Sequence, residues 1–347
     1  MTGDTSDKRI AMLGAGSWGT ALAFSLAAHG GHEVALWSRR AELAHAIQTS
    51  RRNDRYLPGV SLSERVRVTS DLEEAVQGAW LWVIAVPSQF VRPLGMQLAD
   101  KVADGITVVS VAKGIENDTL MTTTEVLHDV LPAEDPSQIG VLYGPSHAEE
   151  VAAARPTSVV VAFPDLGAAE RVQEAFMTRM LRVYVNADLR GVEVGGSVKN
   201  VMALAAGMSD GLGLGDNAKA ALVTRGLAEI KRLAEAMGAD PVTLTGLAGL
   251  GDLVVTCFSQ HSRNRRFGEM IGQGRSVEEA HAAMTMVVEG VRTTASVHAL
   301  ARKYNVEMPI TEAVYAILFK GLHPHDAVHG LMTRDPKIEH VNASVEA

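Results

Sequence analysis

The sequence predicts an α/β protein in which a doubly wound, parallel sheet is followed by an all-helical C-terminal domain. Three observations lead to this prediction. A short apolar strand runs into Gly14-Ala15-Gly16-Ser17-Trp18-Gly19 and then into an alanine-rich helix. Short β-branched runs alternate with helical stretches up to about residue 190. After Asp188 that alternation fades, and helical periodicity dominates to the end of the chain.

The length and composition predict two globular domains. A chain of 347 residues is longer than one ordinary domain, and 47% hydrophobic with 21% charged residues is typical of a globular protein. We place the first domain at residues 1–188 and the helical domain at 189–335, and we assign no role to the tail at 336–347.

Charge and cysteine content argue against several classes of function. A net charge of −8 without a long basic run disfavours nucleic-acid binding, so a few placed cations must hold any anionic ligand. The apolar run at 79–86 is far shorter than the ~18 residues of a membrane span, and the polar segment 1–8 is too short for a signal peptide. The single cysteine, Cys257, is expected to be a buried apolar side chain in a reducing cytoplasm. Twelve scattered histidines predict no metal site.

The glycine-rich turn is the strongest local signal in the chain. It follows the strand Ile10–Leu13 and opens a helix, which is the setting in which such a turn binds a dinucleotide. Gly14 permits the tight turn, Gly16 lets a pyrophosphate approach the backbone, and Gly19 lets the helix pack closely on the strand. The first domain is therefore expected to be a Rossmann-type nucleotide domain.

The second strand indicates which dinucleotide is bound. A strictly NAD-binding protein would carry a carboxylate for the ribose at its end, but Glu33–Trp37 is followed by Ser38-Arg39-Arg40. Two guanidinium groups match the charge of a 2′-phosphate. We expect NADP as the preferred cofactor and NAD as the second choice. The alternative is that Arg39 and Arg40 are solvated surface residues.

The remaining strands bring further polar residues to one edge of the sheet. They are expected at Val66–Thr69, Leu81–Ala85, Thr107–Ser110, Ile139–Leu142, Ser158–Ala162 and Leu181–Val185. A capping box at Ser70-Asp71-Leu72-Glu73 is expected to start the helix after the third strand. The segments 87–89, 113–114 and 144–146 follow strand ends, and we expect them to share one crevice.

The second domain is expected to consist of helices. Asp216 can cap a helix that stops at Gly238, and further helices are expected at 263–273, 276–284, 289–304 and 309–320. Lys199 is the only charged residue between Glu193 and Asp210, on a helix that is otherwise suited to burial. Desolvation would lower its pKa and make it usable as a base. The alternative is a lysine whose amine reaches the surface at a helix start.

Two later segments supply partners for such a base. Gly246–Asp252 is a glycine-dense loop that delivers one carboxylate, and Ser262-Arg263-Asn264 delivers a hydroxyl, a guanidinium and an amide in succession. A phosphomonoester carries three acceptor oxygens and about two negative charges, so this donor set suits it. Each segment alone is also typical of an ordinary connection or helix start.

These motifs together resemble one known family. From Ile10 to about Leu322 the chain is similar to the bacterial NAD(P)-dependent glycerol-3-phosphate dehydrogenases. The resemblance rests on the motifs at 14–19, 56–59, 86–89, 113–116, 144–146, 195–200, 210–217, 224–226, 246–252, 262–264 and 288–290. His147 departs from the family, which more often has an aromatic residue after Gly-Pro-Ser.

The resemblance implies a role for individual residues. Cofactor contacts are implied for Gly14, Gly16, Ser17, Trp18, Gly19, Arg39, Arg40, Tyr56, Lys113, Ala148, Arg263, Val287 and Glu289. Substrate contacts are implied for Lys113, Gly144, Ser146, Lys199, Asp252, Ser262, Arg263 and Asn264. Lys199 is implied to transfer the proton, with Lys113 and Asp252 as its catalytic partners.

The implied reaction is reversible hydride transfer between sn-glycerol 3-phosphate and dihydroxyacetone phosphate, mainly in the reductive direction that supplies phospholipid precursors. A homodimeric cytoplasmic enzyme is expected, with a small-molecule substrate as its partner. Two alternatives stay open: another dehydrogenase of the β-hydroxyacid type, which would bind a carboxylate instead of a phosphate, or a non-catalytic protein that senses NADP.

Overall fold

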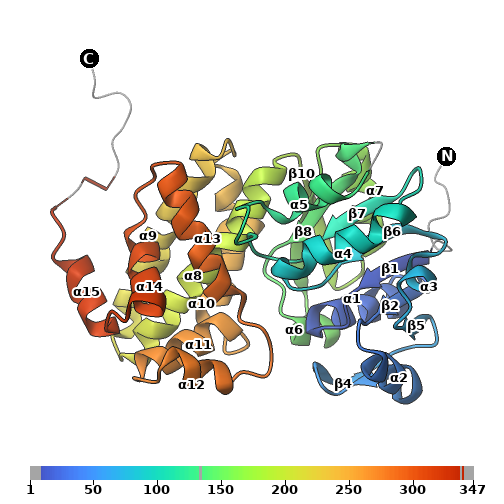
Figure 1. Cartoon of the computed structure of the whole chain (residues 1–347), viewed down its shortest axis with the longest axis horizontal. Coiled ribbons are helices and arrows are strands. Elements are labelled where there is room, and N and C mark those ends of the chain that lie inside the picture. The colour runs from blue at the N-terminus through green and yellow to red at the C-terminus, as the bar shows by residue number, and fades with distance from the viewer. Residues whose placement is uncertain (1–8, 133–134, 337, 340–347) are drawn as a thin grey trace.

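A computed structural model describes residues 9–132, 135–336 and 338–339. Of the predicted tail at 336–347, residue 337 and residues 340–347 lie outside the described residues. The polar segment 1–8 lies outside them as well. Figure 1 shows a sheet-containing lobe beside a helical lobe along the longest axis of the molecule. This arrangement confirms the predicted fold class.

One eight-stranded sheet forms the first lobe, in the order β10-β9-β8-β7-β6-β1-β2-β5. Its strands are β1 (Arg9–Leu13), β2 (Val34–Trp37), β5 (Val66–Thr69), β6 (Ala79–Ile84), β7 (Thr107–Ser110), β8 (Ile139–Tyr143), β9 (Thr157–Ala162) and β10 (Leu181–Asn186). All eight predicted strands are thus present, with ends shifted by two residues at most.

The prediction of a parallel sheet is wrong at one edge. The pair β8·β9 is antiparallel, so β9 and β10 run against the other six strands while remaining parallel to each other. The apolar pattern could not reveal this, because a strand covered on both faces looks the same in either direction. The structure also adds an unpredicted hairpin of β3 (Arg52–Asn53) and β4 (Leu57–Ser61).

Helices cover both faces of the sheet. Those of the first lobe are α1 (Ser17–Ala28), α2 (Ala41–Ser50), α3 (Leu72–Val76), α4 (Val91–Leu98), α5 (Thr123–Val130), α6 (Ala148–Ala152) and α7 (Leu166–Phe176). Buried residues of α1, α2 and α7 share one apolar core, and those of α3, α4 and α5 share the core on the opposite face. The cap of α3 is Asp71, whose side chain accepts from the amides of Glu73 and Glu74, so the predicted cap at Ser70 is wrong by one residue.

The second lobe is helical among the residues that the structure describes. Its helices are α8 (Leu189–Gly211), α9 (Gly215–Ala236), α10 (Asp252–Phe258), α11 (Arg263–Gly272), α12 (Val277–Ala282), α13 (Glu289–Lys303), α14 (Pro309–Lys320) and α15 (Pro324–Met332). Short turns lie at η1 (Ser88–Phe90), η2 (Ala99–Lys101), η3 (Pro136–Gln138) and η4 (Thr243–Thr245), with a π-helical turn at η5 (Leu247–Gly251).

Two local predictions for this lobe need correction. Asp216 lies within the first turn of α9 and does not cap it, because the helix already starts at Gly215. The expected loop at 246–252 is helical, since η5 leads directly into α10. Helix α15 has no predicted counterpart. The prediction that Cys257 is buried is confirmed, and burial raises the pKa of its thiol to about 12.

Helix α8 is the central element of the second lobe. Asp188 caps its N-terminus by accepting from the amide of Gly191 at 2.9 Å. The helix is buried from Gly191 to Ser209, and its first turns pack on β8 and β9 while later turns join the core of the helical lobe. A charged side chain on this helix therefore lies in an apolar setting unless it is paired.

Candidate active site

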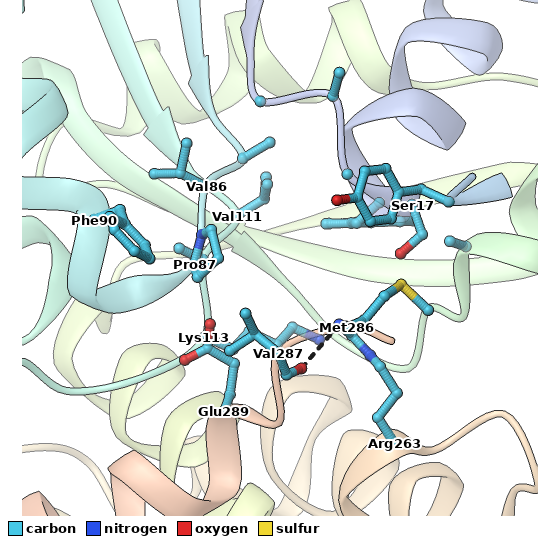
Figure 2. Close-up of a pocket in the computed structure, with 18 of the residues that line it drawn as sticks. Ser17, Val86, Pro87, Phe90, Val111, Lys113, Arg263, Met286, Val287 and Glu289 are labelled. Atoms are coloured by element: carbon cyan, nitrogen blue, oxygen red, sulfur yellow. Dashed lines mark hydrogen bonds between the residues drawn. The ribbon is translucent and has the colours of Figure 1, made fainter. Parts of the chain in front are cut away.

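A cleft of about 610 Å³ lies where the carboxyl ends of the parallel strands face the helical lobe. In Figure 2, Val86, Pro87 and Lys113 come from strand ends and face Arg263, Val287 and Glu289 of the second lobe. Of the predicted site residues, only Gly19, Gly144 and Asp252 do not line this cleft. Those that do are Gly14, Gly16, Ser17, Trp18, Arg39, Arg40, Tyr56, Lys113, Ser146, Ala148, Lys199, Ser262, Arg263, Asn264, Val287 and Glu289.

The glycine-rich turn has the local geometry that a nucleotide phosphate needs. Gly14 has a φ of 136°, and a Cβ there would lie 2.5 Å from the carbonyl oxygen of Ala85. A Cβ on Gly19 would overlap the carbonyl oxygen of Gly14, so α1 packs directly on the turn. A Cβ on Gly16 would meet nothing within 4 Å, and this glycine lines the cleft. The positive end of the α1 dipole therefore opens toward the cleft.

The two arginines after β2 line one end of the cleft and stack on aromatic rings. The guanidinium carbon of Arg39 lies 5.6 Å from the Phe90 ring centroid. Arg40 lies 5.3 Å from the ring of Tyr56 and donates a hydrogen bond to its hydroxyl. Both arginines are exposed at the cleft, so their guanidinium groups are open to solvent and to an anionic ligand group.

A buried carboxylate joins two lysines from different lobes at the base of the cleft. Asp252 is 1% exposed, and its Oδ2 accepts from Lys113 Nζ at 2.7 Å. Its Oδ1 accepts from Lys199, which is 5% exposed. Lys199 Nζ also donates to Thr256 Oγ1 at 2.7 Å. The amine that could have reached the surface is therefore buried and paired, which decides between the two interpretations of its position.

The surroundings of Lys199 shift its proton affinity toward neutrality. Burial lowers its pKa to about 8, the ammonium of Lys113 acts in the same direction, and Asp252 opposes both. Since Lys113 also donates to the carbonyl of Gly144 at 2.9 Å, its position depends on the loop after β8. Lys199 can thus exist as ammonium or as amine near neutral pH, as a proton-transfer group must.

The predicted phosphate-binding segment starts helix α11. Ser262 caps this helix by accepting from the amide of Arg265, and Arg263 Nη1 donates to the carbonyl of Val287 at 3.1 Å. Asn264 donates to Asn200 Oδ1 and accepts from the amide of Gly290, each at 2.9 Å. One amide hydrogen of Asn264 is left for a ligand. The structure therefore brings all three residues to the cleft. Part of their hydrogen-bonding capacity is used by other residues of the protein.

Glu289 faces the cleft from the N-terminus of α13. Its carboxylate accepts from the amide and the hydroxyl of Ser88, at 3.1 Å and 2.7 Å, and burial raises its pKa. Ser146 Oγ donates to the carbonyl of Gly144 at 2.9 Å. Ala148 is buried at the start of α6 and packs beside α1, and Val287 is 41% exposed.

Three residues of this site received no role from the sequence. Thr256 bonds Lys199 and lies one helical turn after Asp252, a spacing that becomes informative only if α10 is recognised as a helix. Ser88 holds Glu289 across the lobes. Asn200 joins Asn264 to the carbonyl of Lys113. These partners are far apart in the sequence, so no residue spacing could predict the contacts between them.

Metal-binding clusters and membrane-spanning helices are both absent from the part of the chain that the structure describes. Within residues 9–132, 135–336 and 338–339, no group of three or more His, Cys, Asp or Glu side chains could hold a metal ion. Among the same residues no helix is long and apolar enough to cross a membrane.

A nucleotide turn that faces a buried lysine held by a carboxylate defines the class of nucleotide-dependent oxidoreductases.

Comparison with known proteins identifies the family. The N-terminal model of NAD-dependent glycerol-3-phosphate dehydrogenase matches residues 9–169, and the C-terminal model matches 188–329. The chain is 58% identical over 331 residues to an NAD(P)+ glycerol-3-phosphate dehydrogenase of Salinibacter ruber, covering 95% of this chain and 96% of that protein. A homologue from Chlorobium phaeobacteroides is 54% identical, with 95% and 99% covered.

Solved structures agree with this assignment. A crystal structure of glycerol-3-phosphate dehydrogenase from Coxiella burnetii matches with a TM-score of 0.90 at 41% identity, covering 95% of this chain and all of that one. The chain belongs to the NAD-dependent glycerol-3-phosphate dehydrogenase family. This finding confirms the resemblance drawn from the sequence motifs.

Proposed function

We propose that this protein interconverts sn-glycerol 3-phosphate and dihydroxyacetone phosphate with a nicotinamide cofactor, mainly toward sn-glycerol 3-phosphate for phospholipid synthesis. The observation that carries the proposal is the Lys113–Asp252–Lys199 arrangement at the base of a cleft that also contains the nucleotide turn. The relatives described above are named for this activity, and they cover nearly the whole chain.

The cofactor would be held at the sheet side of the cleft. Gly16, Ser17 and Trp18 would contact its phosphates at the α1 N-terminus, and the open space at Gly16 fits this role. Arg39 and Arg40 would bind a 2′-phosphate, so NADP is proposed as the preferred cofactor and NAD as the second. When bound, the nicotinamide supplies hydride transfer to or from C2 of the substrate.

Lys199 would carry the proton. In reduction its ammonium donates to the developing alkoxide on C2, and in oxidation its neutral amine removes the C2 hydroxyl proton. Lys113 would polarise the same oxygen, and Asp252 would orient both amines. Two cations on one buried carboxylate leave a net positive charge, which suits an anionic substrate and an oxyanion.

The phosphate of the substrate would bind at the start of α11. Ser262, Arg263 and Asn264 supply hydroxyl, guanidinium and amide donors there, and Ser146 lines the same cleft. Gly144 does not line the cleft itself, and its carbonyl accepts from Ser146 Oγ. Burial lowers the pKa of Arg263. An anion would offset the desolvation that causes this shift. Because this anchor lies away from the reacting carbon, its binding energy can position C2.

Several coarser expectations accompany this proposal. The division into residues 1–188, 189–335 and a tail at 336–347 stays a prediction, as do a homodimer and a cytoplasmic location. The single buried cysteine suits a reducing compartment. Light scattering of the purified protein measures the oligomeric state, and a molar mass of one chain would contradict the dimer.

Steady-state rates test the proposed function. The purified chain is assayed with dihydroxyacetone phosphate and NADPH or NADH, and then with sn-glycerol 3-phosphate and the oxidised cofactors. A panel of 6-phosphogluconate and 3-hydroxyisobutyrate tests the other dehydrogenase class. We expect turnover of the three-carbon phosphates alone. Turnover of a hydroxyacid in their place would overturn the substrate assignment, and cofactor binding without any turnover would favour a sensor.

A further inference from the structure

The backbone that carries Lys113 is held by side chains rather than by the sheet. Strand β7 ends at Ser110, and the carbonyl groups of residues 112–114 each accept a side-chain hydrogen bond. Tyr143 Oη donates to the first carbonyl, Asn200 Nδ2 to the second at 3.3 Å, and Ser197 Oγ to the third at 3.2 Å. Three consecutive carbonyls with dedicated donors fix the local backbone direction.

Tyr143 is itself fixed in place. The residue is fully buried at the end of β8, and a Cβ on Gly196 of α8 would lie 2.5 Å from its ring. Thr123 Oγ1 lies 3.2 Å from Tyr143 Oη. Burial raises the pKa of this hydroxyl well above its ordinary value, so it stays protonated and remains a donor. The tyrosine therefore links α8, α5 and the segment after β7.

The same tyrosine also contacts the other end of Lys113. Lys113 Nζ lies 5.7 Å from the Tyr143 ring centroid and donates to the carbonyl of Gly144, the next residue in the chain. From there it reaches Asp252 Oδ2 at 2.7 Å. Both the main chain and the amine of Lys113 thus depend on where Tyr143 lies.

We propose that Tyr143 and Ser197 are positioning residues that hold the Lys113 ammonium beside Asp252, opposite Lys199, before the substrate binds. This inference rests on the proposed function, in which both lysines act on the C2 oxygen. Neither hydroxyl is needed for contact with the substrate, because each is committed to a backbone carbonyl.

Loss of these two hydroxyl groups should change the pKa of Lys199, which loss of a purely structural contact would not do. The charged and titratable groups that act on Lys199 are Asp252, Lys113, Cys257 and His147. Of these, Lys113 lowers the pKa of Lys199, whereas Asp252 raises it. If Lys113 moves away from Asp252, Lys199 loses a nearby positive charge and still pairs with the carboxylate of Asp252. Its pKa must then rise from about 8.

The experiment compares Tyr143→Phe and Ser197→Ala with matched controls elsewhere. Tyr184→Phe removes a hydroxyl from a half-exposed tyrosine on β10, and Ser209→Ala removes one near the far end of α8. The pH profile of kcat/KM for dihydroxyacetone phosphate reduction should fall at a pH about 0.5–1 higher in the two test variants than in wild type. Their kcat should drop by about 10-fold while the KM for NADPH stays constant. The controls should match wild type in both respects.

A second measurement gives the pKa of Lys199 without turnover. The rate of acetylation of Lys199 by acetic anhydride is followed against pH by peptide mass spectrometry, in the absence of substrate. A higher pKa in both test variants supports the proposal even if the natural substrate is a different one. An unchanged pKa in a variant that melts like wild type overturns it, whatever the loss of activity. If Tyr143→Phe fails to fold, Ser197→Ala alone decides.

Discussion

The cleft is lined by more cationic than anionic side chains, with Arg39, Arg40, Lys113, Lys199, Arg263 and Arg266 against Glu149 and Glu289. Asp252 pairs with Lys113 and Lys199, and Arg263 lies across the cleft at the start of α11. In a chain with a formal net charge of −8, this local excess of cations concentrates the attraction for an anion at one place. The arrangement also explains the lowered pKa of Lys199, since burial and a like charge both oppose its ammonium form.

Replacing Lys199 tests the proton-transfer role at the residue scale. Lys199→Met keeps the length and apolar stem of the side chain, and Asp252 keeps Lys113 as a partner. Turnover of dihydroxyacetone phosphate should fall by more than ~10-fold, because general acid catalysis contributes about 10²–10⁴-fold. Cofactor binding and the melting temperature serve as controls. A loss of less than ~10-fold in a folded variant would mean that another group moves the proton.

Replacing Arg39 tests the cofactor preference. The charge-assisted bond to a 2′-phosphate is worth ~1–3 kcal/mol, so Arg39→Ala should reduce the preference for NADPH over NADH by a factor of roughly 5–150. Arg302→Ala, an exposed arginine on α13, is the control. The ratio of kcat/KM for the two cofactors is the measurement. Equal use of both cofactors by the wild-type protein would show that the arginines are not phosphate ligands.

At the scale of elements, glycines set the distance between α8 and α11. A Cβ on Gly207 would overlap the carbonyl oxygen of Arg265, and a Cβ on Gly268 would overlap that of Leu204. Gly211 and Gly272 are in equally close contact. Because the two helices can approach only without side chains here, Lys199 and the segment 262–264 come to lie on the same cleft.

This packing predicts opposite effects for two glycines in helices. Gly268→Ala forces α8 and α11 apart, which should destabilise the fold by about 1–3 kcal/mol and raise the KM for dihydroxyacetone phosphate. Gly330→Ala on α15 is the matched control, since a Cβ there meets nothing within 4 Å. It should be neutral or stabilise by about 0.5–1 kcal/mol, because alanine favours the helix. Chemical denaturation and steady-state kinetics distinguish the two, and equal effects would contradict the packing argument.

At the scale of the whole molecule, buried polar groups join the two lobes. Glu193 on α8 accepts from the hydroxyls of Thr122, Thr123 and Thr124 and from the amide of Thr124. Ser88 bonds Glu289, and Lys113 bonds Asp252. Burial raises the pKa of Glu193 and of Glu289. The stability of the molecule should therefore depend on the protonation of these carboxyl groups between the lobes.

Glu229 offers the clearest test of this dependence. It accepts from the amides of Ile310 and Thr311 at the start of α14, and burial raises its pKa from 4.5 to about 7. Between these two values the folded state holds a proton that the unfolded state has lost. The contribution of Glu229 to the free energy of unfolding is therefore largest at low pH. It declines as the pH rises from 4.5 to about 7, and it stays constant above that pH.

The variant Glu229→Gln carries no titratable group at this position, and it gives up one of the two amide-accepting oxygens at every pH. Relative to wild type it should gain on the order of 3 kcal/mol between pH 4.5 and 7.5. Urea unfolding across this range is the measurement, and Glu235→Gln, exposed on the same helix, is the control. A constant difference between variant and wild type over the range would show that Glu229 does not titrate on unfolding.

Local patterns predicted most elements and the two ends of the cleft. The strand at 10–13 with its glycine turn, Arg39 and Arg40 at a strand end, and Ser262-Arg263-Asn264 at a helix start each depend on neighbours within a few residues. Such short-range signals predict strands, turns and donor sets without knowledge of packing. The same rules missed η5, because a glycine-rich segment has a low helix propensity and only tertiary contacts make it helical.

By itself the sequence determined the class of fold, the family and the set of residues available for chemistry. Tertiary structure alone decided that one carboxylate lies between Lys113 and Lys199, that β9 and β10 reverse direction, and that Tyr143 reaches the carbonyl of Ala112. The reason is physical. Periodicity and turn chemistry act between near neighbours, whereas the contacts of Asp252 with the two lysines and of Tyr143 with Ala112 join residues 31 to 139 positions apart, and burial gives them their strength.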